Sequence, residues 1–208
     1  MHKNGTSVQK LQIFKTVVLG EMDIAENVYE MMCFAIRMNH NEYVSPDAMA
    51  KLRQKNPNTI RSPEEDLGTQ EIVLDHTVQI SAARNINLNV KKLCGDVDIV
   101  HISGNDVKYL FDNNTNPMNY ANAVQNITRT MRTKKRCSSV SENNITCVCR
   151  LHMCISWYPC DLKYCQGEDT TGKSSEFRCG IKTCGKCRDF DFLASEKNHC
   201  FWDNRQKS

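Results

Sequence analysis

Apolar residues in the first part of the chain fall into short runs separated by polar turns. The run over residues 11–19 is rich in β-branched residues and predicts a strand that ends at Gly20. A second apolar run covers residues 28–36, where periodicity alone leaves strand and helix both open. Residues 71–80 predict a further strand. These runs give the first part of the chain the pattern of an ordinary folded domain.

Helix signals lie between these runs. Residues 45–47 (Ser-Pro-Asp) combine an N-cap, a proline suited to the first turn and an acidic residue at the positive end of the helix dipole, so we expect a helix to begin there. Pro57 limits that helix at its far end. Residues 88–97 predict a weaker helix around Cys94, and residues 106–111 predict a short one. Strands and helices are therefore mixed along this part of the chain.

The composition changes near residue 115. From there, asparagine, threonine and basic residues dominate, and ten of the twelve cysteines then follow between Cys137 and Cys200. A stretch this short buries too little apolar surface to fold on a core alone, so disulfides must replace much of that core. We therefore divide the chain into a first domain over residues 1–115, a linker over residues 116–136 and a cysteine-rich module over residues 137–208.

The pairing of the cysteines in this module cannot be read from the sequence. Cys147 and Cys149 are separated by one residue, which in a strand places their α-carbons at the extreme of bridging range, so we expect them to have different partners. The ten cysteines of the module are Cys137, Cys147, Cys149, Cys154, Cys160, Cys165, Cys179, Cys184, Cys187 and Cys200.

The cysteine density and four Asn-X-Ser/Thr sequons indicate an extracellular, secreted protein. Disulfides persist outside the reducing cytosol, and sequons accept glycans during export. The four sequon asparagines are Asn4, Asn113, Asn126 and Asn144. The polar start contains no apolar signal-peptide core, so either the protein is cytosolic or its true start lies upstream of Met1, and we favour the second interpretation. No apolar run is long enough to predict a membrane span.

The charge of the chain does not favour nucleic acid as a partner. The formal net charge is only +3. The single basic cluster, over residues 129–136, lacks interleaved aromatic residues, so a solvated linker is the preferred interpretation of it. A second interpretation is a processing site, because proteolytic nicking concentrates in exposed linkers.

Two motifs raise the question of chemistry at the cysteines. Cys184-Gly-Lys-Cys187 has the spacing of a thioredoxin-like redox site, but it lies among many other cysteines without a βαβ setting. Zinc binding is the alternative role for these cysteines, although His152 and His199 have no partner at zinc-finger spacing. Neither a nucleophile–histidine pattern nor a phosphate-binding glycine loop is evident. We predict a non-enzymatic protein with no catalytic residue, no cofactor and no metal ligand.

Long and unusual motifs along the chain resemble the out at first protein family. The likeness runs from about Gln12 to Asp203. The motifs that carry it cover residues 47–57 (DAMAKLRQKNP), 147–149 (CVC), 157–165 (WYPCDLKYC), 179–184 (CGIKTC), 189–192 (DFDF) and 200–203 (CFWD). The resemblance implies a secreted protein with further sequence ahead of Met1. It also implies eight cysteines in the C-terminal module, so the additional Cys154 and Cys187 imply one extra disulfide between them.

The first domain also resembles the BRICHOS fold. An apolar strand with a cysteine, residues 32–36, is followed by a helix start at residues 44–49, and Cys94 lies on a late helix. The resemblance implies an α+β fold with an antiparallel sheet and helices, and a disulfide between Cys33 and Cys94. BRICHOS domains also carry an early aspartate that residues 1–22 lack, so we expect its equivalent upstream and a sheet edge left open to another chain.

Two functions follow from these resemblances. In the first, the BRICHOS-like domain binds extended or aggregation-prone peptide segments in a chaperone-like way, by strand addition. In the second, the cysteine-rich module is a developmental signalling ligand or receptor-binding unit. Both functions require a protein or peptide partner rather than nucleic acid.

Overall fold

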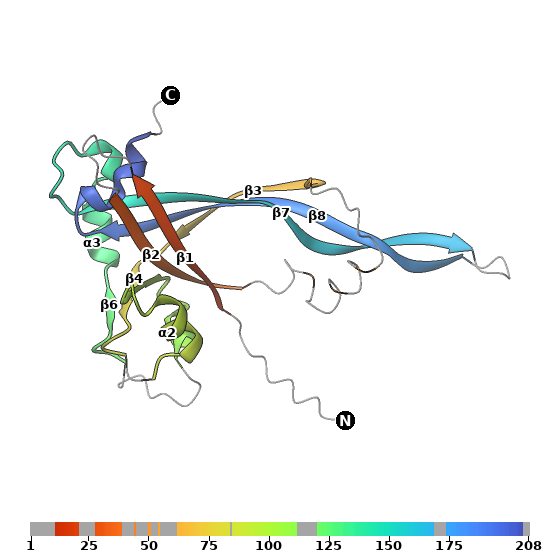
Figure 1. Ribbon diagram of the computed structural model, residues 1–208, viewed down its shortest axis with the longest axis horizontal. Coiled ribbons are helices and arrows are strands. Elements are labelled where there is room, and N and C mark those ends of the chain that lie inside the picture. The colour runs from red at the N-terminus through yellow and green to blue at the C-terminus, as the bar shows by residue number, and fades with distance from the viewer. Residues whose placement is uncertain are drawn as a thin grey trace. The chain divides into compact units, whose positions relative to one another are not determined.

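Strands predominate over short helices in the computed structural model, which describes residues 11–20, 28–38, 44, 50, 54, 62–83, 85–111, 120–168 and 174–205 (Figure 1). The predicted α+β, disulfide-rich class is confirmed. The elements, with η for 3-10 helices, are β1 (Leu11–Gly20), β2 (Val28–Arg37), β3 (Glu65–Val73), β4 (His76–Gln79), α2 (Leu88–Cys94), β5 (Ile99–Ile102), η2 (Val107–Leu110), β6 (Val124–Asn126), α3 (Thr128–Thr133), η4 (Cys137–Ser139), β7 (Cys147–Glu168), β8 (Ser174–Ala194) and η5 (Lys197–Arg205).

The chain divides into two compact units. The first unit contains residues 1–38, 71–151 and 189–208, and the second unit contains residues 39–70 and 152–188. Each unit therefore combines residues of the predicted first domain with residues of the predicted cysteine-rich module. The boundaries expected after residues 115 and 136 do not coincide with the limits of these units. The expected linker contributes β6 and α3 to the first unit.

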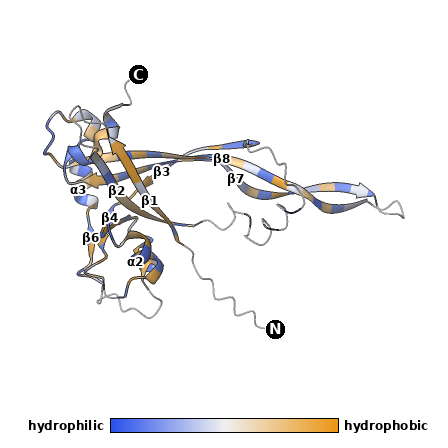
Figure 2. Ribbon diagram, viewed as in Figure 1, coloured by the Kyte–Doolittle hydropathy of each residue, from blue (hydrophilic) through white to orange (hydrophobic). Residues whose placement is uncertain are grey.

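Five strands form the sheet of the first unit, in the order β1-β2-β5-β4-β6. The pair β2 and β5 is parallel and the other neighbours are antiparallel, so the sheet is mixed rather than wholly antiparallel. The runs over residues 11–19 and 28–36 become β1 and β2, which settles the second run as a strand. Figure 2 shows the apolar character of β1.

The strand predicted over residues 71–80 is wrong as a single element. The structure ends β3 at Val73 and begins β4 at His76, and these two strands belong to different sheets. The carboxylate of Asp75 accepts hydrogen bonds from the backbone N–H of Gly104 at 2.8 Å and from the hydroxyl of Thr128 at 3.2 Å. The break between β3 and β4 is thus fixed by hydrogen-bond partners 29 and 53 residues away from Asp75. The local pattern of apolar and polar residues cannot reveal such distant partners.

The helix predictions have different outcomes. The helix expected from residue 45 falls mostly outside the described residues, although Ala50 and Gln54 are helical. The helix expected over residues 88–97 is α2, and the Asn87 side chain caps it by accepting a hydrogen bond from the backbone N–H of Asn89 at 2.9 Å. The helix expected over residues 106–111 is the 3-10 helix η2. Among the described residues, no helix is long and apolar enough to cross a membrane.

The two faces of the β1–β2 pair contact different clusters. Successive side chains of a strand point to opposite faces. Cys33 belongs to an apolar cluster that includes Val90 and Cys94 of α2. Phe34 lies on the other face, where its ring stacks on Phe190 with ring centroids 5.1 Å apart. The sheet of the first unit is therefore buried on both faces over this stretch.

The strands β3, β8 and β7 form a second sheet with β8 in the middle. All three strands have residues in both units. In the second unit, a small cluster of Tyr158, Cys160 and Cys184 is buried, with Ile155 packed against it. The second unit therefore has little apolar core of its own among the described residues.

Candidate functional site

All twelve cysteines are joined in six disulfides. The pairs are Cys33–Cys94, Cys137–Cys147, Cys149–Cys200, Cys154–Cys187, Cys160–Cys184 and Cys165–Cys179. The structure brings together the two pairs that the resemblances implied, Cys33 with Cys94 and Cys154 with Cys187. Cys147 and Cys149 have different partners.

The thioredoxin-like motif does not form a redox pair. Cys184 is bonded to Cys160 and Cys187 to Cys154, and both members of the motif lie in β8. Residues three apart on a strand point to opposite faces, which places their sulfur atoms too far apart to bond to each other. The two cysteines of the motif therefore form two separate disulfides that link β8 to β7.

Two of the four sequon asparagines lie in the described part of the chain. Asn126 is exposed at the end of β6, an edge strand, and its side-chain oxygen accepts a hydrogen bond from the backbone N–H of Thr128 at 2.9 Å. Asn144 is exposed before β7. Asn4 and Asn113 lie outside the described residues. The two described asparagines have the exposure that an attached glycan requires.

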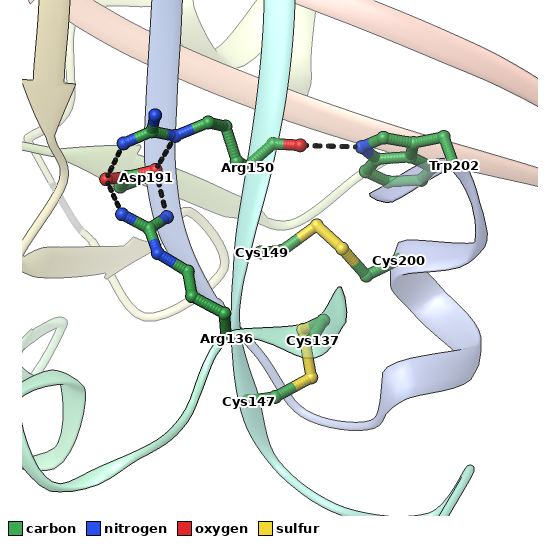
Figure 3. The surroundings of a disulfide bond; sticks show 8 residues. All are labelled: Arg136, Cys137, Cys147, Cys149, Arg150, Asp191, Cys200 and Trp202. Carbon is green, nitrogen blue, oxygen red and sulfur yellow. Dashed lines mark hydrogen bonds and ion pairs between the residues drawn. A yellow bond between two sulfur atoms is a disulfide. The ribbon is translucent and has the colours of Figure 1, made fainter. Parts of the chain in front are cut away.

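A cluster of charged residues surrounds Asp191 in the first unit (Figure 3). Arg136 donates to both carboxylate oxygens of Asp191, at 2.5 and 2.7 Å. Arg150 also donates to both oxygens, at 2.8 and 2.9 Å, and to Asp189 at 3.3 Å. Each guanidinium thus makes a bidentate contact, which is the strongest geometry for such a pair.

The environment of Asp191 keeps this carboxylate ionised. Burial alone would raise the pKa of Asp191, but the hydrogen bonds from Arg150 and Arg136 outweigh burial and hold the pKa below its usual value. The same contacts raise the pKa of Arg136 and of Arg150. Because all four contacts converge on one carboxylate, the cluster stabilises the fold and leaves Asp191 poorly placed to act as a base.

Two disulfides lie beside this cluster (Figure 3). Cys149 is bonded to Cys200, and the indole N–H of Trp202 donates to the backbone oxygen of Arg150 at 3.0 Å. Cys137 is bonded to Cys147. One region of the first unit, crosslinked by two disulfides, therefore contains the end of the expected linker together with parts of β7, β8 and η5.

Sequence reasoning missed the Arg136–Asp191–Arg150 cluster. Arg136 belongs to the basic cluster that was interpreted as a solvated linker or processing site, and Arg150 carried no prediction. The alternation Asp189-Phe-Asp-Phe192 was the one available signal. It sends the aspartates to one face of β8 and the phenylalanines to the other, where Phe192 contacts the ring of Phe34.

An apolar patch lies at the edge of the first sheet, and we call it the β1 edge patch. It consists of Val17, Leu19 and Tyr29, which are 54%, 73% and 58% exposed. Leu19 lies opposite Tyr29 in the antiparallel register. The patch shares its face with Leu11 and Ile13, which pack against the core nearer the other end of β1. Among the described residues, β1 pairs only with β2, so its other edge is not paired with a strand.

Comparisons with known proteins cover nearly the whole chain. The family model described as "Out at first" matches residues 6–110, and the one described as "Out at first, C-terminal" matches residues 136–204. The "Out at first protein" of Drosophila virilis is 38% identical over 205 residues, or 93% of this chain and 67% of that protein. The "Out at first protein" of Drosophila melanogaster is 37% identical over 210 residues, or 95% of this chain and 43% of that protein. The chain therefore spans less than half of the second relative, and no solved structure matches it.

Proposed function

The chain belongs to the out at first family, and on that premise we propose that it is a secreted, glycosylated, non-enzymatic protein that binds extended peptide segments along β1. The observation that carries this proposal is the β1 edge patch beside an edge that no described strand pairs. The names of these relatives specify no binding partner. The partner is therefore stated by its chemistry, as an extended segment with alternating apolar side chains.

The proposed extracellular location is supported by the disulfides and the sequons. All twelve cysteines are paired, which is the state that an oxidising compartment maintains. Asn126 and Asn144 are exposed and could accept glycans. A glycan at Asn126 would stand at the β6 edge, at the opposite end of the strand order from β1. Glycosylation there would therefore leave the β1 edge accessible.

Binding by strand addition requires backbone hydrogen-bonding groups at an edge and pockets for alternate side chains. The ten residues of β1 provide the edge. Val17 and Leu19 alternate with side chains that point to the other face, and Tyr29 widens the apolar area across to β2. A bound segment would extend the sheet to six strands and would cover side chains that water now contacts.

The likeness to BRICHOS domains supports the chaperone-like form of this proposal. Cys33 of β2 is bonded to Cys94 of α2, the link that the resemblance implied. This bond fixes α2 over one end of the β1–β2 pair and leaves the patch beyond it exposed. A chaperone-like domain of this kind would hold β-prone segments at the uncovered end.

Fibril growth of an amyloid-forming peptide tests the proposal. The full chain should be used, because the first unit draws residues from 189–208 and a fragment ending at residue 115 would lack them. We expect the chain to delay fibril growth at substoichiometric ratio and Leu19→Lys to abolish the delay. Leu88→Lys is the matched control, since Leu88 is 61% exposed and lies in α2. Equal delay by both variants would contradict binding at β1, and no delay by the unmodified chain would contradict chaperone-like activity toward that peptide.

Receptor binding by the cysteine-rich module is a second candidate, and a separate observation favours it. Tyr164 on β7 and Phe177 on β8 are 50% and 51% exposed, and the Arg178 guanidinium lies 5.9 Å from the Tyr164 ring centroid. Aromatic residues and arginine are enriched in protein–protein interfaces. Cell-surface binding should be lost in Tyr164→Ala/Phe177→Ala and retained in Leu67→Ala, an exposed apolar position on β3. Equal binding by both variants would contradict this role.

A further inference from the structure

The six disulfides differ in their access to solvent. Three pairs in the first unit are fully buried, and the Cys160–Cys184 pair is at most 8% exposed. Two pairs in the second unit are accessible: Cys165 and Cys179 are both exposed, and in the Cys154–Cys187 pair Cys154 is exposed and Cys187 is half-buried. Exposed disulfides are open to attack by thiolates in solution, whereas buried ones are protected. The second unit therefore contains the two disulfides that a reductant can reach first.

The Cys154–Cys187 disulfide differs from the other exposed pair by an adjacent imidazole. The Nε2 atom of His152 lies 3.1 Å from the sulfur of Cys154. His152 and Cys154 both lie in β7, two residues apart, so their side chains leave the same face of the strand. The strand itself therefore keeps the imidazole beside the sulfur.

These three side chains form a compact set of metal-binding atoms. One ligand atom from each of His152, Cys154 and Cys187 lies within 4.8 Å of the others. Sulfur and imidazole nitrogen are the ligands that zinc prefers, and three protein ligands with an open fourth position are common at accessible zinc sites. The buried set of Cys137, Cys149 and Cys200 also lies close together, but it contains no imidazole and is closed to solvent.

We propose that Cys154–Cys187 is a reducible disulfide whose opening creates a zinc site from His152, Cys154 and Cys187. A dithiol reductant breaks the sulfur–sulfur bond by supplying two electrons and two protons, and is itself oxidised to a disulfide. Zinc then binds both sulfurs as thiolates, and the two thiol protons pass to water. The imidazole nitrogen of His152 provides the third ligand and water the fourth. The site would bind zinc only in the reduced protein.

Graded reduction of the full chain tests the first step. The chain is exposed to increasing amounts of a resin-bound dithiol, and the freed thiols are alkylated and mapped by mass spectrometry. We expect Cys154 and Cys187 to be alkylated before any cysteine of the four buried pairs. Alkylation of a buried pair at the same or lower reductant concentration would overturn the proposal. Cys165 and Cys179 can open at a similar concentration without affecting it.

Cobalt and zinc test the second step in the partly reduced chain. Cobalt(II) serves as a spectroscopic substitute, because thiolate ligands give it a charge-transfer band that water and imidazole do not. The band should appear in Cys165→Ser/Cys179→Ser, which lacks the other exposed disulfide, and should be absent in Cys154→Ser/Cys187→Ser. His152→Ala should weaken zinc binding at least about tenfold, since even outer-shell partners have effects of that size. His199→Ala is the control, because His199 lies in the first unit and contacts Glu30.

A measurement on the unmodified chain guards against variants that do not fold. Zinc should protect Cys154 and Cys187 of the partly reduced protein from alkylation, and should leave Cys165 and Cys179 reactive. Equal protection of both pairs, or of neither, would overturn the site. A cobalt band that persists in Cys154→Ser/Cys187→Ser would also overturn it.

Discussion

The two units are held together in different ways. In the first unit, the five-stranded sheet is packed on both faces around Cys33 and Phe34, and all three disulfides are buried. In the second unit, three disulfides join β7 to β8, two of them are exposed, and few apolar residues are buried. Disulfides thus add to a core in the first unit, whereas in the second unit they take the place of one.

This contrast also separates the two kinds of surface. The exposed apolar residues of the first unit lie at a sheet edge, where a partner can form backbone hydrogen bonds. The exposed aromatic residues of the second unit lie on strands that disulfides already fix. Peptide capture suits the first arrangement, and presentation of a rigid surface suits the second.

Loss of the Asp191 carboxylate should have the largest effect on stability. Asp191→Ala leaves Arg136 and Arg150 without the carboxylate that both contact. Removing one partner of a buried ion pair costs up to roughly 3 to 5 kcal/mol, and this is the upper limit here because Arg136 is 42% exposed and Arg150 keeps Asp189 as a partner. Chemical denaturation measures this loss. Asp96→Ala is the control, because Asp96 forms its ion pair with Lys15 while 51% exposed, and it should change stability little. Equal effects of both substitutions would contradict a stabilising role for the cluster.

Removal of Cys160–Cys184 should unfold the second unit selectively. The two cysteines are 24 residues apart, so the chain-entropy relation gives a loss of at most about 3.5 kcal/mol for Cys160→Ser/Cys184→Ser. This is an upper limit because Cys154–Cys187 and Cys165–Cys179 already restrict the same loop in the unfolded chain. Hydrogen exchange should then accelerate over residues 152–168 and 174–188, while β2 keeps its protection. Loss of protection in β2 of the same variant would show that the units are not stabilised separately.

Acid should destabilise the first unit through His101. Its ring contacts the rings of both Phe34 and Phe192, its Nδ1 atom is buried, and burial lowers its pKa from 6.5 to about 4. The unfolded chain therefore binds the proton first, so stability falls as the pH decreases from about 6.5 to 4, by about 3 kcal/mol in total. Below pH 4 this contribution is constant.

Urea denaturation at several pH values measures the effect of His101. His101→Leu should lose the part of the pH dependence between 6.5 and 4, because it has no group to protonate. His199→Leu, which replaces an exposed histidine, should keep that dependence. The same slope in both variants would contradict the role of His101.

The smallest effect is expected at the surface of the second unit. Lys163 pairs with Glu64 at 2.6 Å, and both side chains are nearly half exposed. Exposed ion pairs contribute about 0 to 1 kcal/mol, so Lys163→Ala should destabilise the chain by less than about 1 kcal/mol. A larger loss of stability, measured by thermal unfolding, would mean that ion pairs as well as disulfides stabilise this unit.

The sequence predicted those parts of the fold whose signals are local. The run at 11–19 and the helix expected over residues 88–97 each depend on one stretch of chain, and the structure contains β1 and α2 there. The ambiguity at 28–36 was decided only by pairing with β1 and β5, which lie in different parts of the chain. Local pattern therefore identifies elements, while partners decide between alternatives.

The candidate site was less accessible to sequence reasoning. Arg136 and Arg150 contact Asp191 across 55 and 41 residues, and isolated charges in a basic segment resemble any solvated surface. The β1 edge patch consists of residues that look like ordinary core positions of a strand, since exposure depends on whether α2 covers them. Of the other four disulfides, Cys160–Cys184 and Cys165–Cys179 depend on which residues of β7 and β8 lie opposite each other. Cys137–Cys147 and Cys149–Cys200 instead depend on how η4 and η5 pack against β7.

The alternation at Asp189–Phe192 has a consequence for the alignment of β8. A slip of this strand by one residue would exchange its two faces, placing carboxylates against Phe34 and His101 and phenyl rings against guanidinium groups. The exchange is unfavourable because an apolar cluster cannot solvate charge and because both guanidinium groups would lose the carboxylate that they bind. These four residues therefore favour one register of the 21-residue strand β8 over the registers shifted by one residue.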